Sequence, residues 1–290
     1  MTERNNKIGR HLPTSGGLKK TLEKAGELGC ETVQVFVSNP QGWAVPKSRP
    51  DAEAFAEGAR EMGLSPVVVH AKYLINLASQ NEEQRDRSVE ALAHELVAAG
   101  SIGADLVVVH SGSHGGDGEK IGLERLVEGF GKARERAGEI AGSGQKVAEP
   151  VLENSVGAGT QLCSEFGALA EVSRRAGVKV CVDTAHAFVA GYDLSTPEGA
   201  GEVAEELRTE LGSGVALVHL NDARNEFGSH RDGHRRIGEG HVPQECWTSF
   251  FGGLPGIPVV METPFGTPEV DAEQIRLVKD LTGGLPNSSG

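Results

Sequence analysis

The chain has 290 residues, of which 38% are hydrophobic and 24% charged, a composition typical of globular proteins and not of disordered ones. No apolar run approaches the roughly 20 residues of a membrane span, and residues 1–7 lack the apolar segment of a secretory signal. The net charge of −13 argues, taken alone, against a nucleic-acid partner. Because the sequence shows neither a membrane span nor a secretory signal, we expect a cytoplasmic protein that makes no membrane contact.

Short β-branched runs alternate with longer amphipathic or Ala/Glu-rich segments along the whole chain. In chain order, the sequence predicts strand 8–11, helix 17–28, strand 32–37, helix 51–62, strand 66–70, helix 82–99, strand 106–110, helix 118–141, strand 150–154, helix 161–176, strand 178–183, helix 197–211, strand 215–220, helix 243–250, strand 258–263 and helix 268–281. Runs such as 67–69 and 107–109 are apolar on both faces, as expected of strands that are buried on both sides.

Eight strands in strict alternation with eight helices predict a closed (β/α)8 TIM barrel. An open doubly wound sheet is disfavoured because no glycine-rich phosphate loop follows the first strand. The loop 141–146 is too short for a domain linker. We expect one domain over 1–290, ordered from about 8 to 282, with a flexible tail over 283–290. The four scattered cysteines contain no Cys-x-x-Cys pair and should be buried thiols.

Six successive predicted strands finish with a side chain of the metal-binding kind. These are His70, His110, Glu153, Asp183, His219 and Glu262. The carboxyl ends of the strands of a barrel converge on one mouth, where such folds place their active sites. One histidine at a strand end is ordinary, but close carboxylates repel each other and lose hydration unless a cation compensates them. The pattern therefore predicts a metal centre.

Three further candidates, His186, Asp232 and His234, lie in the loops beyond these strands. Nine ligands are too many for one zinc ion, which prefers about four. Carboxylates mixed with imidazoles suit zinc or manganese better than magnesium or calcium, which prefer oxygen ligands alone.

Several segments of the chain resemble signatures of the endonuclease IV family and follow the order of that family. They are the opening 8–17, HAKYLINL (70–77), LEN (152–154), VDTAH (182–186), HLND (219–222), FGS (227–229), DGH (232–234), IGEG (237–240) and ETP (262–264). The resemblance extends from residue 8 to residue 281. The combination of segments is specific, whereas each one alone is weak.

The resemblance implies a site with three Zn²⁺ ions per chain, one of which could be replaced by Mn²⁺. It divides the nine ligands into three sets, with Glu153 shared by the first two: His70, His110 and Glu153; Glu153, Asp183, His219 and Glu262; His186, Asp232 and His234. It also implies a DNA-repair phosphodiesterase, and because DNA enzymes of this size commonly work as monomers we expect a monomer without an obligate protein partner. Such an enzyme incises double-stranded DNA 5′ to abasic sites and removes 3′-blocking groups, here with Glu153, Asp183 and Glu262 as catalytic residues.

Two loops match the intercalating loops of the family in position, and they carry Gln41, Trp43, Tyr73 and Leu74. The loop 224–236 is locally basic, and we expect its Arg231 and Arg235 to contact DNA phosphates. Packing over the barrel rim is the alternative for the two aromatic residues, and a solvated surface is the alternative for the arginines. Five positions depart from the family pattern, none of them a ligand: Gln41, Lys72, Ser111, Ala158 and Ala185.

Two other functions fit part of the pattern. A sugar isomerase or epimerase of the xylose-isomerase-like superfamily needs Glu153, Asp183, His219 and Glu262, but none of the other five ligands. A non-catalytic protein that binds damaged DNA could keep the metal for stability alone. The full ligand set favours the nuclease over both.

Overall fold

The computed structural model describes residues 6–283, and within them eight parallel strands close into a barrel. The strands are β1 (Ile8–His11), β2 (Thr32–Val35), β3 (Val67–His70), β4 (Leu106–His110), β5 (Glu149–Glu153), β6 (Lys179–Asp183), β7 (Val215–His219) and β10 (Val259–Met261). Hydrogen bonds join them in the order β1-β10-β7-β6-β5-β4-β3-β2. The predicted TIM barrel is confirmed, and each strand lies within a few residues of its predicted range.

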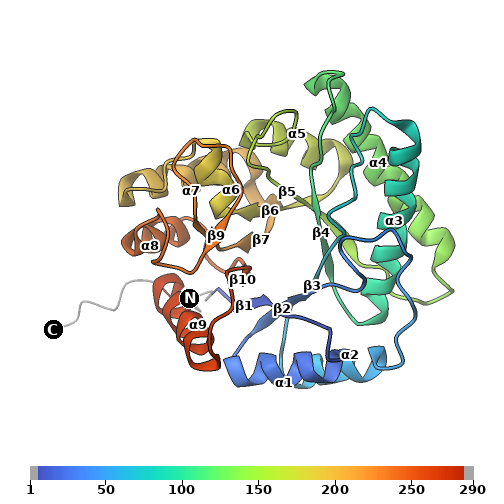
Figure 1. Cartoon of the computed structure of the whole chain (residues 1–290), viewed down its shortest axis with the longest axis horizontal. Helices are drawn as coiled ribbons and strands as arrows, with labels where there is room; N and C mark the ends of the chain where they lie inside the picture. The colour runs from blue at the N-terminus through green and yellow to red at the C-terminus, as the bar shows by residue number, and fades with distance from the viewer. Residues whose placement is uncertain (1–5, 284–290) are drawn as a thin grey trace.

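Helices surround this barrel as an outer ring (Figure 1). Those that the sequence predicts are α1 (Leu18–Leu28), α2 (Ala52–Glu61), α3 (Glu82–Ser101), α4 (Glu119–Ile140), α5 (Phe166–Ala176), α7 (Pro197–Leu211), α8 (Gln244–Gly252) and α9 (Pro268–Thr282). None of the helices within residues 6–283 is long and apolar enough to cross a membrane. The expected flexible tail lies, from residue 284 onwards, outside the described residues.

The prediction that a helix begins at residue 161 is wrong, because α5 begins five residues later. Gln161 forms a β-bridge with Ser113, and the backbone N–H of Leu162 donates to the carbonyl of Gly112. Cys163 has a φ of 59°, a left-handed conformation that an α-helix cannot contain. Residues 161–163 therefore pair with the loop after β4.

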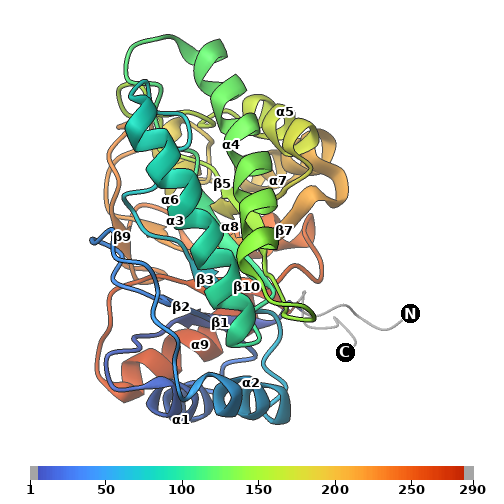
Figure 2. The same cartoon turned by 90° about the vertical axis from the view of Figure 1, so that its right-hand side faces the viewer.

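Short elements at the carboxyl end of the barrel were not predicted. Helix α6 (Thr184–Ala190) begins directly after β6, and a hairpin pairs β8 (Asp222–Ala223) with β9 (His234–Arg235). At the opposite end of the barrel, a 3-10 turn (Gly212–Gly214) that was also not predicted precedes β7. Figure 2 shows β9 and the loop after β2 on the same side of the barrel.

The interior of the barrel contains one apolar layer, which lies directly below the predicted ligands. The layer consists of Val68, Val108, Val151, Cys181, Leu217 and Val260, all fully buried. Each of these residues lies two positions before one of the six ligand-type side chains. Because side chains alternate between the two faces of a strand, the six ligands also point inward, one level nearer the mouth. The two-residue period of the strands therefore places all six ligand-type side chains inside the barrel, at its mouth.

Candidate metal centre

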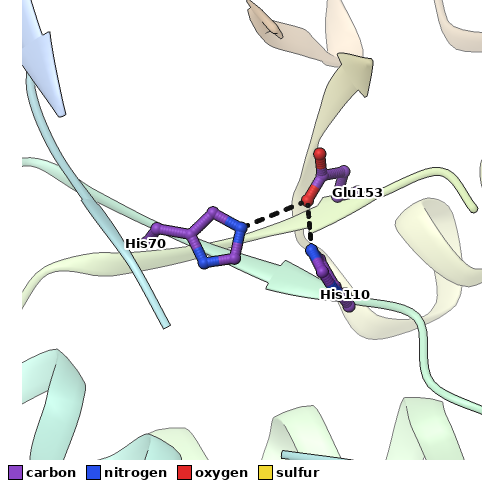
Figure 3. Close-up of side chains that lie close together, drawn as sticks. All are labelled: His70, His110 and Glu153. Atoms are coloured by element: carbon purple, nitrogen blue, oxygen red, sulfur yellow. Dashed lines mark ion pairs between the residues drawn. The ribbon is translucent and has the colours of Figure 1, made fainter. Parts of the chain in front are cut away.

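The first group of ligand-type side chains forms where β3, β4 and β5 end (Figure 3). Nε2 of His70 lies 3.6 Å, and Nε2 of His110 lies 3.2 Å, from Oε2 of Glu153. This Oε2 is buried and has no hydrogen-bond donor among the described residues. Nδ1 of His70 donates to the carbonyl of Ala71 at 2.7 Å, so in the neutral ring the lone pair is on Nε2. A buried anionic oxygen facing two imidazole nitrogens is suited to a divalent cation.

The second group uses the other oxygen of Glu153. Nδ1 of His219 lies 2.8 Å from Oε1 of Glu153 and 3.3 Å from Oε2 of Glu262. Together with Asp183, these residues offer four ligand atoms that lie within 4.8 Å of one another. Glu262 is one residue beyond the end of β10, whereas His219 is the last residue of β7. The two oxygens of Glu153 therefore face two different groups.

Cys181 also lies within 4.8 Å of Glu153 and His219 through its sulfur atom. Burial raises the pKa of this thiol to about 12. A metal binds the thiolate and not the thiol, so this environment disfavours Cys181 as a ligand. All four cysteines are free and buried, as the sequence predicts.

The third group lies at the rim of the mouth. Asp183, His186 and His234 offer ligand atoms within 4.8 Å of one another. Oδ1 of Asp232 is 3.3 Å from Nε2 of His186 and 3.5 Å from Nε2 of His234. Nε2 of His234 is buried without a hydrogen-bond partner among residues 6–283, while the side chain of Asp232 is 62% exposed. The structure places Asp183 in this group as well as in the second.

Helix α6 begins where it does because of Asp183. The carboxylate of this residue accepts a hydrogen bond from the backbone N–H of His186 at 2.8 Å, an N-cap that turns the chain into a helix. His186 is thereby brought back over the mouth, where its Nδ1 donates to the carbonyl of Asn154 at 3.0 Å. The β8–β9 hairpin returns His234 to the same place.

The buried charges of the centre stabilise one another. Burial would raise the pKa of Glu153, but the imidazoles of His219 and His110 outweigh burial and hold this pKa well below the usual value. For His186 burial acts in the opposite direction and lowers the pKa, yet the carboxylates of Asp183 and Asp232 raise this pKa to about 10. Without a metal, protonated imidazoles are therefore the partners of the carboxylates. Because metals bind neutral imidazole, a bound cation would replace the imidazole protons in this role.

Three buried amide side chains contact the ligand-type residues, and none of the three was predicted to have this role. Asn154 accepts a hydrogen bond from the backbone N–H of Asp183 at 2.7 Å. Asn221 donates to Oδ2 of Asp183 at 2.7 Å and accepts from the backbone N–H of Glu262 at 2.9 Å. Gln34 contacts His219 and Glu262. The sequence signal for Gln34 was a glutamine between two valines of the buried strand β2.

Two cavities open beside the ligands. One of about 520 Å³ is lined by all three groups, and one of about 490 Å³ extends from His110 and His186 to Trp43 and Leu74. Tyr73 lines both cavities and is 51% exposed. Its backbone N–H donates to the carbonyl of Pro40, which joins the two predicted intercalating loops.

The other predicted DNA-contact residues differ in their surroundings. Gln41 is exposed, whereas Trp43 is half-buried, packs against the core and lies 4.5 Å from the guanidinium of Arg87. Arg231 and Arg235 are both exposed, and no ion pair involves either of them within residues 6–283. In the same loop, Arg236 pairs with Glu239 at 3.2 Å.

Lys72, a departure from the family pattern, is buried beneath these loops. Its ammonium group lies 3.2 Å from Glu95 of α3 and contacts the hydroxyl of Ser38. A buried ion pair with a further hydrogen bond therefore connects α3 to the loop after β2 and to the segment before Tyr73.

The fold and the groups of ligand-type side chains at its mouth define a TIM-barrel protein with a candidate metal centre. Comparisons with known proteins agree with this class. The family model of the xylose isomerase-like TIM barrel matches residues 22–281. The "Probable endonuclease 4" of Streptomyces coelicolor is 39% identical over 285 residues, which cover 94% of this chain and 95% of that protein. The crystal structure of endonuclease IV from Thermus thermophilus superimposes with a TM-score of 0.83 at 32% identity, covering 96% and 99% of the two chains.

The chain therefore belongs to the endonuclease IV family of xylose isomerase-like TIM barrels. A D-tagatose 3-epimerase-like protein matches at 20% identity with a TM-score of 0.68, covering 94% of this chain and 98% of the other. At that identity the match shows the shared fold alone.

Proposed function

We propose that this protein is a metal-dependent AP endonuclease that incises double-stranded DNA 5′ to abasic sites and removes 3′-blocking groups. The observation that carries the proposal is the position of Glu153, because its two carboxylate oxygens face separate groups of ligand-type side chains. Relatives named endonuclease 4 and endonuclease IV support the same activity.

In this proposal three zinc ions occupy the centre, with manganese as an alternative at one position. His70, His110 and Glu153 hold the first ion. Glu153 would also contribute to the second, together with Asp183, His219 and Glu262. His186, Asp232 and His234 hold the third, beside the second oxygen of Asp183.

Bound divalent cations would neutralise the phosphodiester, activate the attacking water and stabilise the departing 3′-oxygen. The task of the chain is to hold nine ligand side chains in place. Glu153 is 1% exposed and Asp183 is fully buried, so neither carboxylate can turn towards solvent. Asn154 and Asn221 fix Asp183 through its backbone and its side chain, respectively. Glu153, Asp183 and Glu262 are the proposed catalytic carboxylates.

A sugar isomerase or epimerase is the main alternative, since Glu153, Asp183, His219 and Glu262 form a complete group by themselves. Such an enzyme has no use for the five ligand-type side chains of the flanking groups. Elemental analysis of protein purified without chelators should therefore give about three divalent ions per chain, mostly zinc. The His186→Ala, His234→Ala double variant should give about two. One tightly bound ion in both proteins would favour the isomerase.

The proposed partner is damaged duplex DNA, bound by a monomer without an obligate protein partner. Cations at the mouth would offset the net charge of −13 where the phosphate lies. Arg231 and Arg235 are free to contact neighbouring phosphates. Trp43, Tyr73 and Leu74 line the cavities, where an exposed abasic sugar would have to enter, and Gln41 is exposed in the same loop as Trp43.

The Tyr73→Ala variant should bind an abasic duplex roughly 5- to 150-fold more weakly, because one aromatic–base contact contributes about 1–3 kcal/mol. Metal content and thermal stability should not change, since the side chain is half exposed. Tyr73→Phe keeps the ring and serves as the control. Fluorescence anisotropy measures the affinity. A loss of stability as large as the loss of affinity would instead indicate packing over the rim.

A further inference from the structure

Gln34 is a fully buried polar side chain on β2, a strand that carries none of the predicted ligands. Its amide nitrogen lies 2.6 Å from Oε1 of Glu262 and 3.0 Å from Nδ1 of His11, and its amide oxygen lies 2.8 Å from Nε2 of His219. One amide thus contacts two side chains of the second ligand group and the end of β1.

The chemistry of these partners fixes the orientation of the amide. An ionised carboxylate only accepts hydrogen bonds, so the NH₂ group must face Glu262. The oxygen then faces His219, and Nε2 of this imidazole must carry the hydrogen that it donates. When the ring is neutral, as metal binding requires, the lone pair of His219 is consequently on Nδ1, the atom that faces Glu153 and Glu262 at 2.8 and 3.3 Å.

The same arrangement occurs at two other ligand histidines, but with backbone acceptors. His70 and His186 each donate from Nδ1 to a carbonyl, that of Ala71 and that of Asn154, respectively. In each case the opposite nitrogen faces the metal centre. His219 is the member of this set whose tautomer depends on a side chain, and that side chain can be replaced without altering the backbone.

We propose that Gln34 is a positioning residue of the metal centre, which fixes the tautomer of His219 and the orientation of the Glu262 carboxylate so that both present ligand atoms to one ion. The proposal rests on the proposed metal centre. His11 completes the arrangement because its Nδ1 accepts the second N–H of the amide. Hydrogen-bond partners of this kind typically change metal affinity by about 10- to 100-fold.

Two variants test the proposal. Gln34→Leu has a similar size and no hydrogen-bonding group, while Gln34→Asn is one methylene too short to contact both ligands at once. In a chelator competition, each should release one of three ions at a roughly 10- to 100-fold lower chelator concentration and retain the other two. With Co²⁺ in place of zinc, the visible absorption of one ion should change.

Gln274→Leu is the matched control, because Gln274 is a glutamine of α9 whose side chain, within residues 6–283, forms hydrogen bonds only with the backbone of Ile237. It should release its ions as the wild type does. Simultaneous loss of all three ions in both Gln34 variants would indicate a merely structural role and overturn the proposal, as would release identical to that of the wild type. Fewer than three ions in the wild-type protein would instead contradict the proposed function.

Discussion

Replacing Glu153 by glutamine should lower the rate of abasic-site incision by roughly 10³-fold or more. The substitution keeps the size of the side chain but removes the negative charge shared between two groups of ligands. The carboxylate is buried, and its Oε2 faces His70 and His110 without a hydrogen-bond donor among the described residues, so glutamine would leave a cation there without its anionic partner. Single-turnover cleavage of an end-labelled duplex measures the effect, while affinity for the duplex should largely persist.

Glu149→Gln is the matched control for this experiment. Glu149 lies on the same strand at the opposite end of β5, where its side chain is 71% exposed and 3.6 Å from Arg134. This variant should incise at the wild-type rate. Near wild-type incision by Glu153→Gln would show that the bridging assignment is wrong.

The Asp183→Asn variant should lose metal from two positions and incise abasic DNA roughly 10³-fold more slowly, since bound cations contribute several kcal/mol to the transition state. Asp183 belongs to the second and third ligand groups, and its Oδ2 lies 3.5 Å from Nε2 of His234. An asparagine oxygen can still accept the hydrogen bond from the backbone N–H of His186, so α6 should remain.

Elemental analysis together with the rate of incision checks this expectation. Asp193→Asn changes an exposed aspartate in the loop after α6 and should retain both metal content and rate. Three ions per chain in Asp183→Asn would remove Asp183 from the ligand set. Intact circular dichroism should accompany the loss of metal if the role of the residue is ligation.

The barrel and most of the inward-facing side chains of the candidate metal centre could be predicted because both follow from short repeating patterns. A strand buried on both sides is a continuous apolar run, so a histidine or carboxylate at its end stands out, as His110 does after three valines. Alternation along the strand then places that side chain inside the barrel, above the apolar layer that contains Val108.

Other parts of the site give no such signal. Helix α6 has seven residues, too few for a helical period to appear, and β8 and β9 have two residues each. His234 was therefore a candidate because of its residue type alone, and its assignment to the third ligand set came from the family resemblance. Gln34 was missed because its role depends on contacts with β7 and the segment after β10, which lie far away in the sequence.

Incision of a duplex with one abasic site tests the proposed activity most directly. The zinc-loaded protein should cut the damaged strand on the 5′ side of the site and leave a 3′-hydroxyl that a DNA polymerase can extend. It should leave the matched undamaged duplex intact and lose activity after chelation. If the fully loaded protein leaves the abasic strand uncut, or if cleavage is unchanged after the metal has been removed, then the protein is not a metal-dependent AP endonuclease.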